Sequence, residues 1–115
     1  MGPMADLSEP MLTLVQHGND WHIRGVLTMQ SLSAQWRVLE KARPMVEDWQ
    51  IDMSQVTRID SAGLAFLLDC VRYAEQHNMR LSIAGMYEQD WFKLMRVHGI
   101  ESLLVPFIDR YSVKE

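Results

Sequence analysis

The change of hydrophobic period around residue 60 constrains the fold more than any other feature of this sequence. From Trp49 to Val56, apolar and polar side chains alternate, which is the period of a half-buried strand. Beyond it, apolar residues recur at helical spacing as far as Asn78. A strand that leads directly into a long helix predicts a β-α-β crossover, which joins parallel neighbours in one sheet.

The N-terminal third predicts a hairpin followed by a helix. Two alternating segments, 12–15 and 21–27, are separated by a cluster of turn-forming residues, which is typical of paired antiparallel strands. Residues 29–43 have apolar side chains at helical spacing. We expect Ser31 or Ser33 to cap this helix, because a serine hydroxyl accepts a hydrogen bond from a first-turn amide.

The C-terminal third predicts a further strand and helix. Residues 80–86 have strand character, and residues 87–98 have helical spacing closed by Gly99. Residues 103–108 predict either a short last strand or a docking tail. The whole order indicates an α/β fold with a mixed sheet of four or five strands, opened by an antiparallel hairpin, with helices packed on one side.

The length of the chain predicts one domain. A chain of 115 residues is long enough for a single hydrophobic core and too short for two. We expect the domain to cover residues 11–108. Residues 1–10 are expected to form a flexible tail in which Gly2 and Pro3 suggest a cloning remnant, and residues 109–115 a C-terminal tail.

Charge and composition limit the partners. The net charge is −4 and the 11 basic residues are scattered, which argues against binding to nucleic-acid phosphates. The single cysteine, Cys70, cannot form an internal disulfide and suits a reducing compartment. The longest apolar stretch, 62–68, is far shorter than the roughly 20 residues of a membrane span.

The long helix that starts near Ser61 has two apolar faces when its residues are placed about 100° apart. The expected core face comprises Leu64, Leu67, Leu68 and Val71. The opposite face, which we call the outer stripe, comprises Phe66, Asp69, Cys70 and Tyr73. Either another element of the same domain covers the outer stripe, or the stripe is an interface with Phe66 and Tyr73 as anchors. Its adjacency to Ser61 favours the interface.

Ser61 has two predicted roles at the start of this helix. The simpler one is that of the N-cap, whose hydroxyl accepts a hydrogen bond from an amide one turn further on. The unpaired first-turn amides and the helix dipole would also stabilise a phosphoryl group at this position. The added charge would then block a partner that docks beside it. Ser61 is therefore also a candidate phosphoacceptor.

Between Ile51 and Leu68, a strand that ends in Asp-hydrophobic-Ser is followed by a short loop and by Asp60-Ser61-Ala62-Gly63-Leu64, which opens the helix. This pattern resembles the signature of STAS domains, the family of anti-sigma factor antagonists and of sulfate-transporter tails. The turns at 24–28 and 81–85 are also similar to the family. The resemblance implies a STAS fold, and in the antagonists the serine at the position of Ser61 accepts phosphate from a partner kinase.

The compact length, Trp36 and the run from Asp60 to Leu68 most resemble the STAS subunits of Mla-type phospholipid ABC transporters, which maintain the lipid asymmetry of the outer membrane. This resemblance implies a non-catalytic cytoplasmic subunit, peripheral to the inner membrane, that binds and stabilises the ATPase and through it the permease. The expected contact residues are Asp60, Ser61, Ala62, Leu64, Ala65 and the outer stripe, Phe66, Asp69, Cys70 and Tyr73. The alternatives are an anti-sigma factor antagonist switched by phosphorylation at Ser61, and a domain detached from a larger anion transporter.

The sequence has no pattern that indicates an enzyme. It lacks a GxxxxGK[ST] loop, and its four histidines are far apart with no zinc-ligand spacing. Ser61 lacks the Gly-x-Ser-x-Gly context of a nucleophile elbow. Asp52 and Asp60 stand at strand or loop ends, where aspartate commonly makes turn hydrogen bonds. We therefore expect no catalytic residues, no metal and no cofactor.

Overall fold

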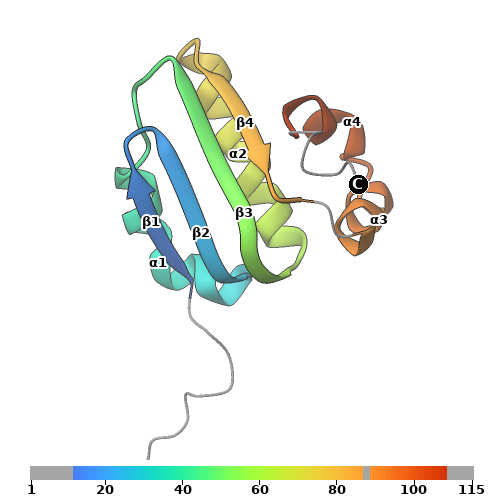
Figure 1. The fold of residues 1–115 in the computed structure, drawn as a ribbon. Helices are drawn as coiled ribbons and strands as arrows, with labels where there is room; N and C mark the ends of the chain where they lie inside the picture. Colours follow the sequence, from blue (N-terminus) through green and yellow to red (C-terminus); the bar gives the residue numbers. More distant parts are fainter. Residues whose placement is uncertain (1–11, 87–88, 109–115) are drawn as a thin grey trace, which may run out of the picture.

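A computed structural model describes residues 12–86 and 89–108, so the two predicted tails, 1–10 and 109–115, lie outside the described residues. Its four strands form one sheet in the order β1-β2-β3-β4 (Figure 1). They are β1 Thr13–His17, β2 Asp20–Leu27, β3 Asp48–Ile59 and β4 Arg80–Ala84. β1 pairs with β2 in antiparallel fashion, and the β2–β3 and β3–β4 pairs are parallel. The predicted mixed sheet opened by a hairpin is confirmed.

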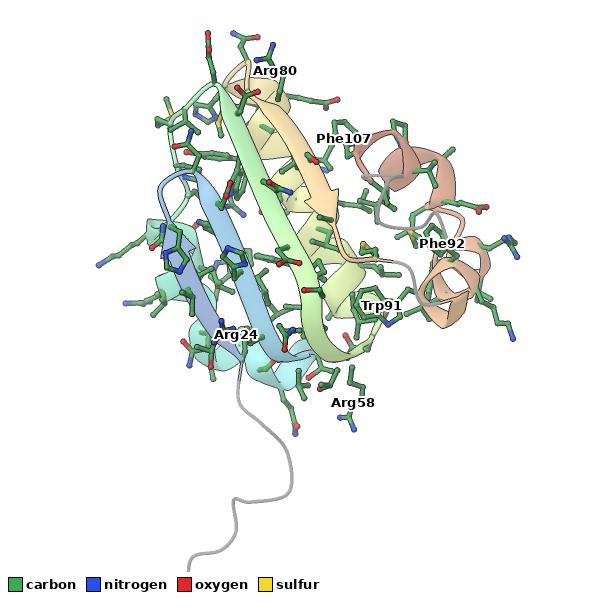
Figure 2. The ribbon with its side chains drawn as sticks, in the orientation of Figure 1. Arg24, Arg58, Arg80, Trp91, Phe92 and Phe107 are labelled. Carbon is green, nitrogen blue, oxygen red and sulfur yellow. The ribbon has the colours of Figure 1, made fainter. Side chains whose placement is uncertain are left out.

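The helices of the described chain are α1 Met29–Lys41, α2 Ser61–Gln76, α3 Gln89–Val97 and α4 Glu101–Leu104, followed by the 3-10 turn η2 Val105–Phe107. Figure 1 shows α1 and α2 behind the sheet and α3 and α4 beyond the β4 edge. Trp91 of α3 is buried on the side of α3 that faces the rest of the domain (Figure 2). The crossover helices therefore cover one face of the sheet, as predicted.

The predicted last strand over 103–108 is wrong except at its end. Residues 101–107 are helical, and only Ile108 makes a parallel bridge, to Ile83 of β4. Pro106 supplies no amide hydrogen to a ladder, which disfavours an extended strand here. The sheet therefore has four strands.

The hydrophobic core lies between the sheet and the two crossover helices. Fully buried side chains of the strands, Trp21, Ile23, Ile51, Met53 and Ile83, form its sheet side. The predicted core face of α2 is largely confirmed, since Leu64 and Leu67 are completely buried and Val71 is nearly so. The other face of the sheet is polar, and there His22 and Asp52 are joined by a hydrogen bond of 3.1 Å between Nδ1 and Oδ2.

The cap of α1 is Thr28, and the predicted cap at Ser31 or Ser33 is wrong. β2 continues to Leu27 and α1 begins at Met29, as its apolar spacing indicates, so Ser31 and Ser33 lie inside the helix and the cap is the residue between strand and helix. Ser31 nevertheless supports the helix start, because its hydroxyl oxygen accepts the backbone N–H of Thr28 at 3.0 Å.

Candidate partner-binding site

The parallel pairing of β2 and β3 brings two helix starts together. Leu27 and Ile59, the last residues of these strands, are partners in the sheet register. α1 and α2 follow these strands directly, so both helices begin at the same end of the sheet. Two helix N-termini, each with unpaired amides and the positive end of a helix dipole, therefore meet at one corner.

Asp60 joins these two helix starts. Its Oδ1 accepts the N–H of Gly63 at 3.0 Å, which makes Asp60 the N-cap of α2. Its Oδ2 accepts the N–H of Met29, the first residue of α1, at 3.1 Å. One carboxylate therefore satisfies a free amide on each helix and carries a negative charge between two positive helix ends.

The predicted N-cap at Ser61 is wrong by one residue. Asp60 has the extended backbone of a cap, and Ser61 is the first residue of α2 with an exposed side chain. Aspartate and serine are about equally good caps, and the carboxylate of Asp60 can also reach the second helix. Ser61 is left facing solvent at the corner.

Gly63 lets α2 start close against the strand ends. A Cβ at this position would collide with the backbone carbonyl oxygen of Leu27 and with Cγ1 of Ile59. The collision with a backbone atom cannot be relieved by a side-chain rotation, so the close approach requires glycine. Gly63 therefore fixes how near Ser61 and the first turn of α2 lie to the end of the sheet.

The outer stripe lies on α2, and we call it the α2 stripe from here on. The domain itself covers it, so the favoured prediction of an exposed interface is wrong and the alternative of internal cover is correct. Phe66 is 3% exposed and Cys70 is fully buried. The ring of Trp36 from α1 packs edge-on against Phe66, with the ring centroids 6.1 Å apart. Burial raises the pKa of the Cys70 thiol well above its usual value, so it is not a reactive group. Leu64 is also fully buried, so its side chain cannot touch a partner in this conformation.

The remaining two residues of the α2 stripe make internal contacts. Asp69 forms an ion pair with Arg43, whose side chain is only 12% exposed. The Tyr73 hydroxyl donates to the carbonyl oxygen of Pro44 at 3.0 Å, and the Arg43 guanidinium lies over the Tyr73 ring, 5.0 Å from its centroid. The chain that follows α1 is thereby held against α2, and Phe66 and Tyr73 are anchors of the fold.

The exposed part of the predicted site is smaller and includes one residue that the sequence did not indicate. Ser61 and Ala65 are exposed, Asp60 and Ala62 are partly exposed, and Met29 at the start of α1 is 65% exposed. We call these five residues the corner. Met29 could have been found from the expected parallel pairing, because helices that follow adjacent parallel strands start side by side.

The corner carries the chemistry of a docking surface. Within residues 12–86 and 89–108, no group of three or more histidine, cysteine or acidic side chains could hold a metal ion. The exposed or partly exposed groups are a hydroxyl, the Asp60 carboxylate that caps both helices, two small methyl-bearing residues and a methionine, a set that suits contact with another protein.

Comparison with known proteins decides the family. A family model described as "Mlab, STAS domain" matches residues 11–106. The chain belongs to the STAS family. It is 25% identical over 95 residues to the intermembrane phospholipid transport system binding protein MlaB of Escherichia coli and to that of Shigella flexneri, covering 83% of this chain and 95% of each relative.

A solved structure shows the same STAS fold. A sulfate transporter family protein from Wolinella succinogenes superposes with a TM-score of 0.57 and 21% sequence identity, covering 78% of this chain and 74% of the other. In the described part of this STAS chain, no helix combines the length and the apolar character needed to cross a membrane.

Proposed function

We propose that this protein is a non-catalytic STAS subunit that binds the ATPase of an Mla-type phospholipid ABC transporter. It would stabilise and regulate that ATPase on the cytoplasmic side of the inner membrane, and so serve the lipid asymmetry of the outer membrane. The similarity to MlaB over most of both chains supports the transporter. The observation that carries the docking role is the exposed corner, a set of small side chains over two joined helix starts.

The corner suits a partner that approaches closely. Ser61 and Ala65 are one helical turn apart and therefore lie on the same face of α2, with Met29 contributed from α1. Small side chains allow a partner group to reach the helix surface, and a methionine adapts its shape to what it meets. By binding only the folded, assembled form of the ATPase, the subunit would favour that form by mass action.

The test is co-purification with the ATPase subunit of the transporter from the same genome. We expect Ser61→Glu to abolish co-purification while the domain stays folded, because a glutamate is well tolerated at the first position of a helix but adds charge and bulk to the corner. Gln76→Glu is the matched control. It adds the same charge to an exposed position on the same helix, about 22 Å away at ~1.5 Å per residue, and should bind as the wild type does.

The interface is elsewhere if Ser61→Glu co-purifies at the wild-type yield. Equal losses in Ser61→Glu and Gln76→Glu would also count against the corner, because they would reflect overall charge. Circular dichroism of each variant establishes that the fold is retained.

A second candidate function is that of an anti-sigma factor antagonist switched by phosphorylation. The observation in its favour is that Ser61 is exposed and lies beside the first amides of a long helix. Because Asp60 caps that helix, the Ser61 hydroxyl is not needed as the cap. Incubation with a candidate serine kinase and ATP should then add one phosphate mass to the peptide containing Ser61. The same treatment of Ser61→Ala should add none, and an unmodified wild-type peptide would leave the transporter function as the proposal.

A further inference from the structure

The two edges of the sheet differ in how they are protected. Next to β4, Ile108 makes a parallel bridge to Ile83, so the C-terminal segment lies along that edge. β1 forms the other edge, and within the described residues it pairs only with β2. An unpaired edge presents a row of free N–H and C=O groups to any strand that can reach it.

β1 has none of the features that usually protect an edge strand. Its sequence, Thr-Leu-Val-Gln-His, contains no lysine, proline or acidic residue. Its pairing with β2 runs from Thr13–Arg24 to His17–Asp20 without a bulge. A regular, uncharged strand can pair with an identical strand without repulsion between like charges.

A groove with a mixed lining of four apolar and two polar residues lies beside this edge on the helix side of the sheet. It has a volume of about 370 Å³ and is formed by β1 and α1. Its lining residues are Leu12, Thr13, Leu14, Gln35, Val38 and Leu39. Val38, one of the apolar lining residues, is 55% exposed. Its exposure leaves apolar surface that a neighbouring molecule could cover.

The charges around β1 indicate which neighbour fits. Thr13, Val15 and His17 share the polar face of the sheet with the β2 residues opposite them, of which Arg24 and Asp20 stand at the two ends. Figure 2 shows Arg24 near the start of β1. A second copy related by a two-fold axis through Val15 would place the Arg24 end of each copy beside the His17–Asp20 end of the other. Thr13 would then face His17 of the other copy and Val15 would face Val15, so no like charges meet across the new strand pair. Arg24 and Asp20 of the other copy would lie three strand spacings apart, ~14 Å, so their attraction adds only a weak, long-range term.

We propose that the β1 edge pairs antiparallel with β1 of a second copy of this chain. The two sheets form one continuous sheet of eight strands, with Val15 facing Val15 at the axis. α1 lies behind β1 and β2, so the two α1 helices come side by side and cover each other's exposed Val38 (Figure 1). Such an isologous contact closes on itself and gives a dimer.

The first test is the mass of the full chain in solution. Sedimentation equilibrium should give twice the 13.4 kDa of one chain at high concentration and dissociate on dilution. We expect Val15→Lys to weaken the dimer by roughly tenfold or more, because it sets two like charges directly opposite each other. Val15→Thr, which keeps the branched shape without a charge, should dimerise. A wild-type chain that stays monomeric at the highest concentration overturns the proposal.

The second test fixes the register by cross-linking and does not depend on the fold of the lysine variant. Val15→Cys should form a disulfide-linked dimer on oxidation, since directly opposite residues have Cβ atoms about 4.5–5.5 Å apart. Thr13→Cys alone should not, because its two copies would be displaced by about 14 Å along the strands. A mixture of Thr13→Cys and His17→Cys should cross-link. A dimer that Val15→Cys fails to trap, or that Thr13→Cys traps alone, uses a different surface. Native Cys70 is fully buried and does not interfere.

Discussion

Removing the carboxylate of Asp60 tests whether one side chain joins the two helix starts. Asp60→Ala leaves the N–H of Gly63 in α2 and the N–H of Met29 in α1 without their acceptor. Neither amide has a partner within its own helix, because the first amides of a helix never do. The loss of both hydrogen bonds should therefore lower the free energy of unfolding of the domain.

The expected magnitude follows from the two bonds. Loss of an N-cap costs about 1 kcal/mol, and loss of the more exposed bond to Met29 about 0.5–1 kcal/mol. Asp60→Ala should therefore lower the free energy of unfolding by about 2 kcal/mol, which shifts Tm by about 8 °C in a domain of this size. Asp60→Asn keeps one oxygen for Gly63 but loses the charge and the second acceptor, so it should lose only about 1 kcal/mol.

A double-mutant cycle in urea isolates the bond between the two helices. Met29→Pro removes the donor without breaking α1, because proline is well tolerated at the first helical position and Thr28 before it is already extended. Asp60→Ala and Met29→Pro should be less than additive by about 0.5–1 kcal/mol. Additive effects, or a loss below about 0.5 kcal/mol in Asp60→Ala, would refute the idea that Asp60 joins the two helices.

Two further perturbations test the surroundings of the corner and the polar sheet face. Gly63→Ala should destabilise the domain by about 1–3 kcal/mol in urea, since its Cβ meets the carbonyl of Leu27, and an unchanged stability would contradict the close approach. Burial raises the pKa of Asp52, but hydrogen bonds from Ser54 and His22 outweigh it and hold that pKa below its usual value. Asp52 therefore stabilises the fold above its unfolded pKa of about 3.9, and this stability is lost as the pH falls through the folded value. Asp52→Asn should flatten the fall in Tm below about pH 4, and an equally steep fall in the variant would contradict this.

Much of the fold is predictable because strands and helices leave different periods in the sequence. The hairpin and the two crossovers follow from alternation over residues 21–27 and 49–56 and from helical spacing after residue 60. The capping residues of the helices and the end of β3 are harder to predict. β3 continues to Ile59 because its parallel pairing with β2 extends that far, and only then does Asp60 become the cap. A pairing between distant segments thus decides a boundary that local spacing leaves open.

The α2 stripe shows why the candidate site could be predicted only in part. A helical wheel tells which residues of one helix share a face, but it does not tell what lies on that face. Trp36 is 30 residues away from Phe66 in the sequence, and the direction in which α1 returns along the sheet brings the two rings together. Arg43 pairs with Asp69 for the same reason. The favoured prediction of an interface with another protein is therefore wrong for this face, and the alternative is correct: α1 and the segment that follows it cover the stripe.

The covered stripe changes where the binding energy of a docked partner must come from. Hot spots at protein interfaces are usually large aromatic or arginine side chains, and the corner contains none. Its residues are small or flexible, so the anchoring side chain of the complex would be supplied by the partner and received between Ser61, Ala65 and Met29. On this view Ser61 contributes mainly by being small and uncharged, and a charged residue there fills the space that the partner requires.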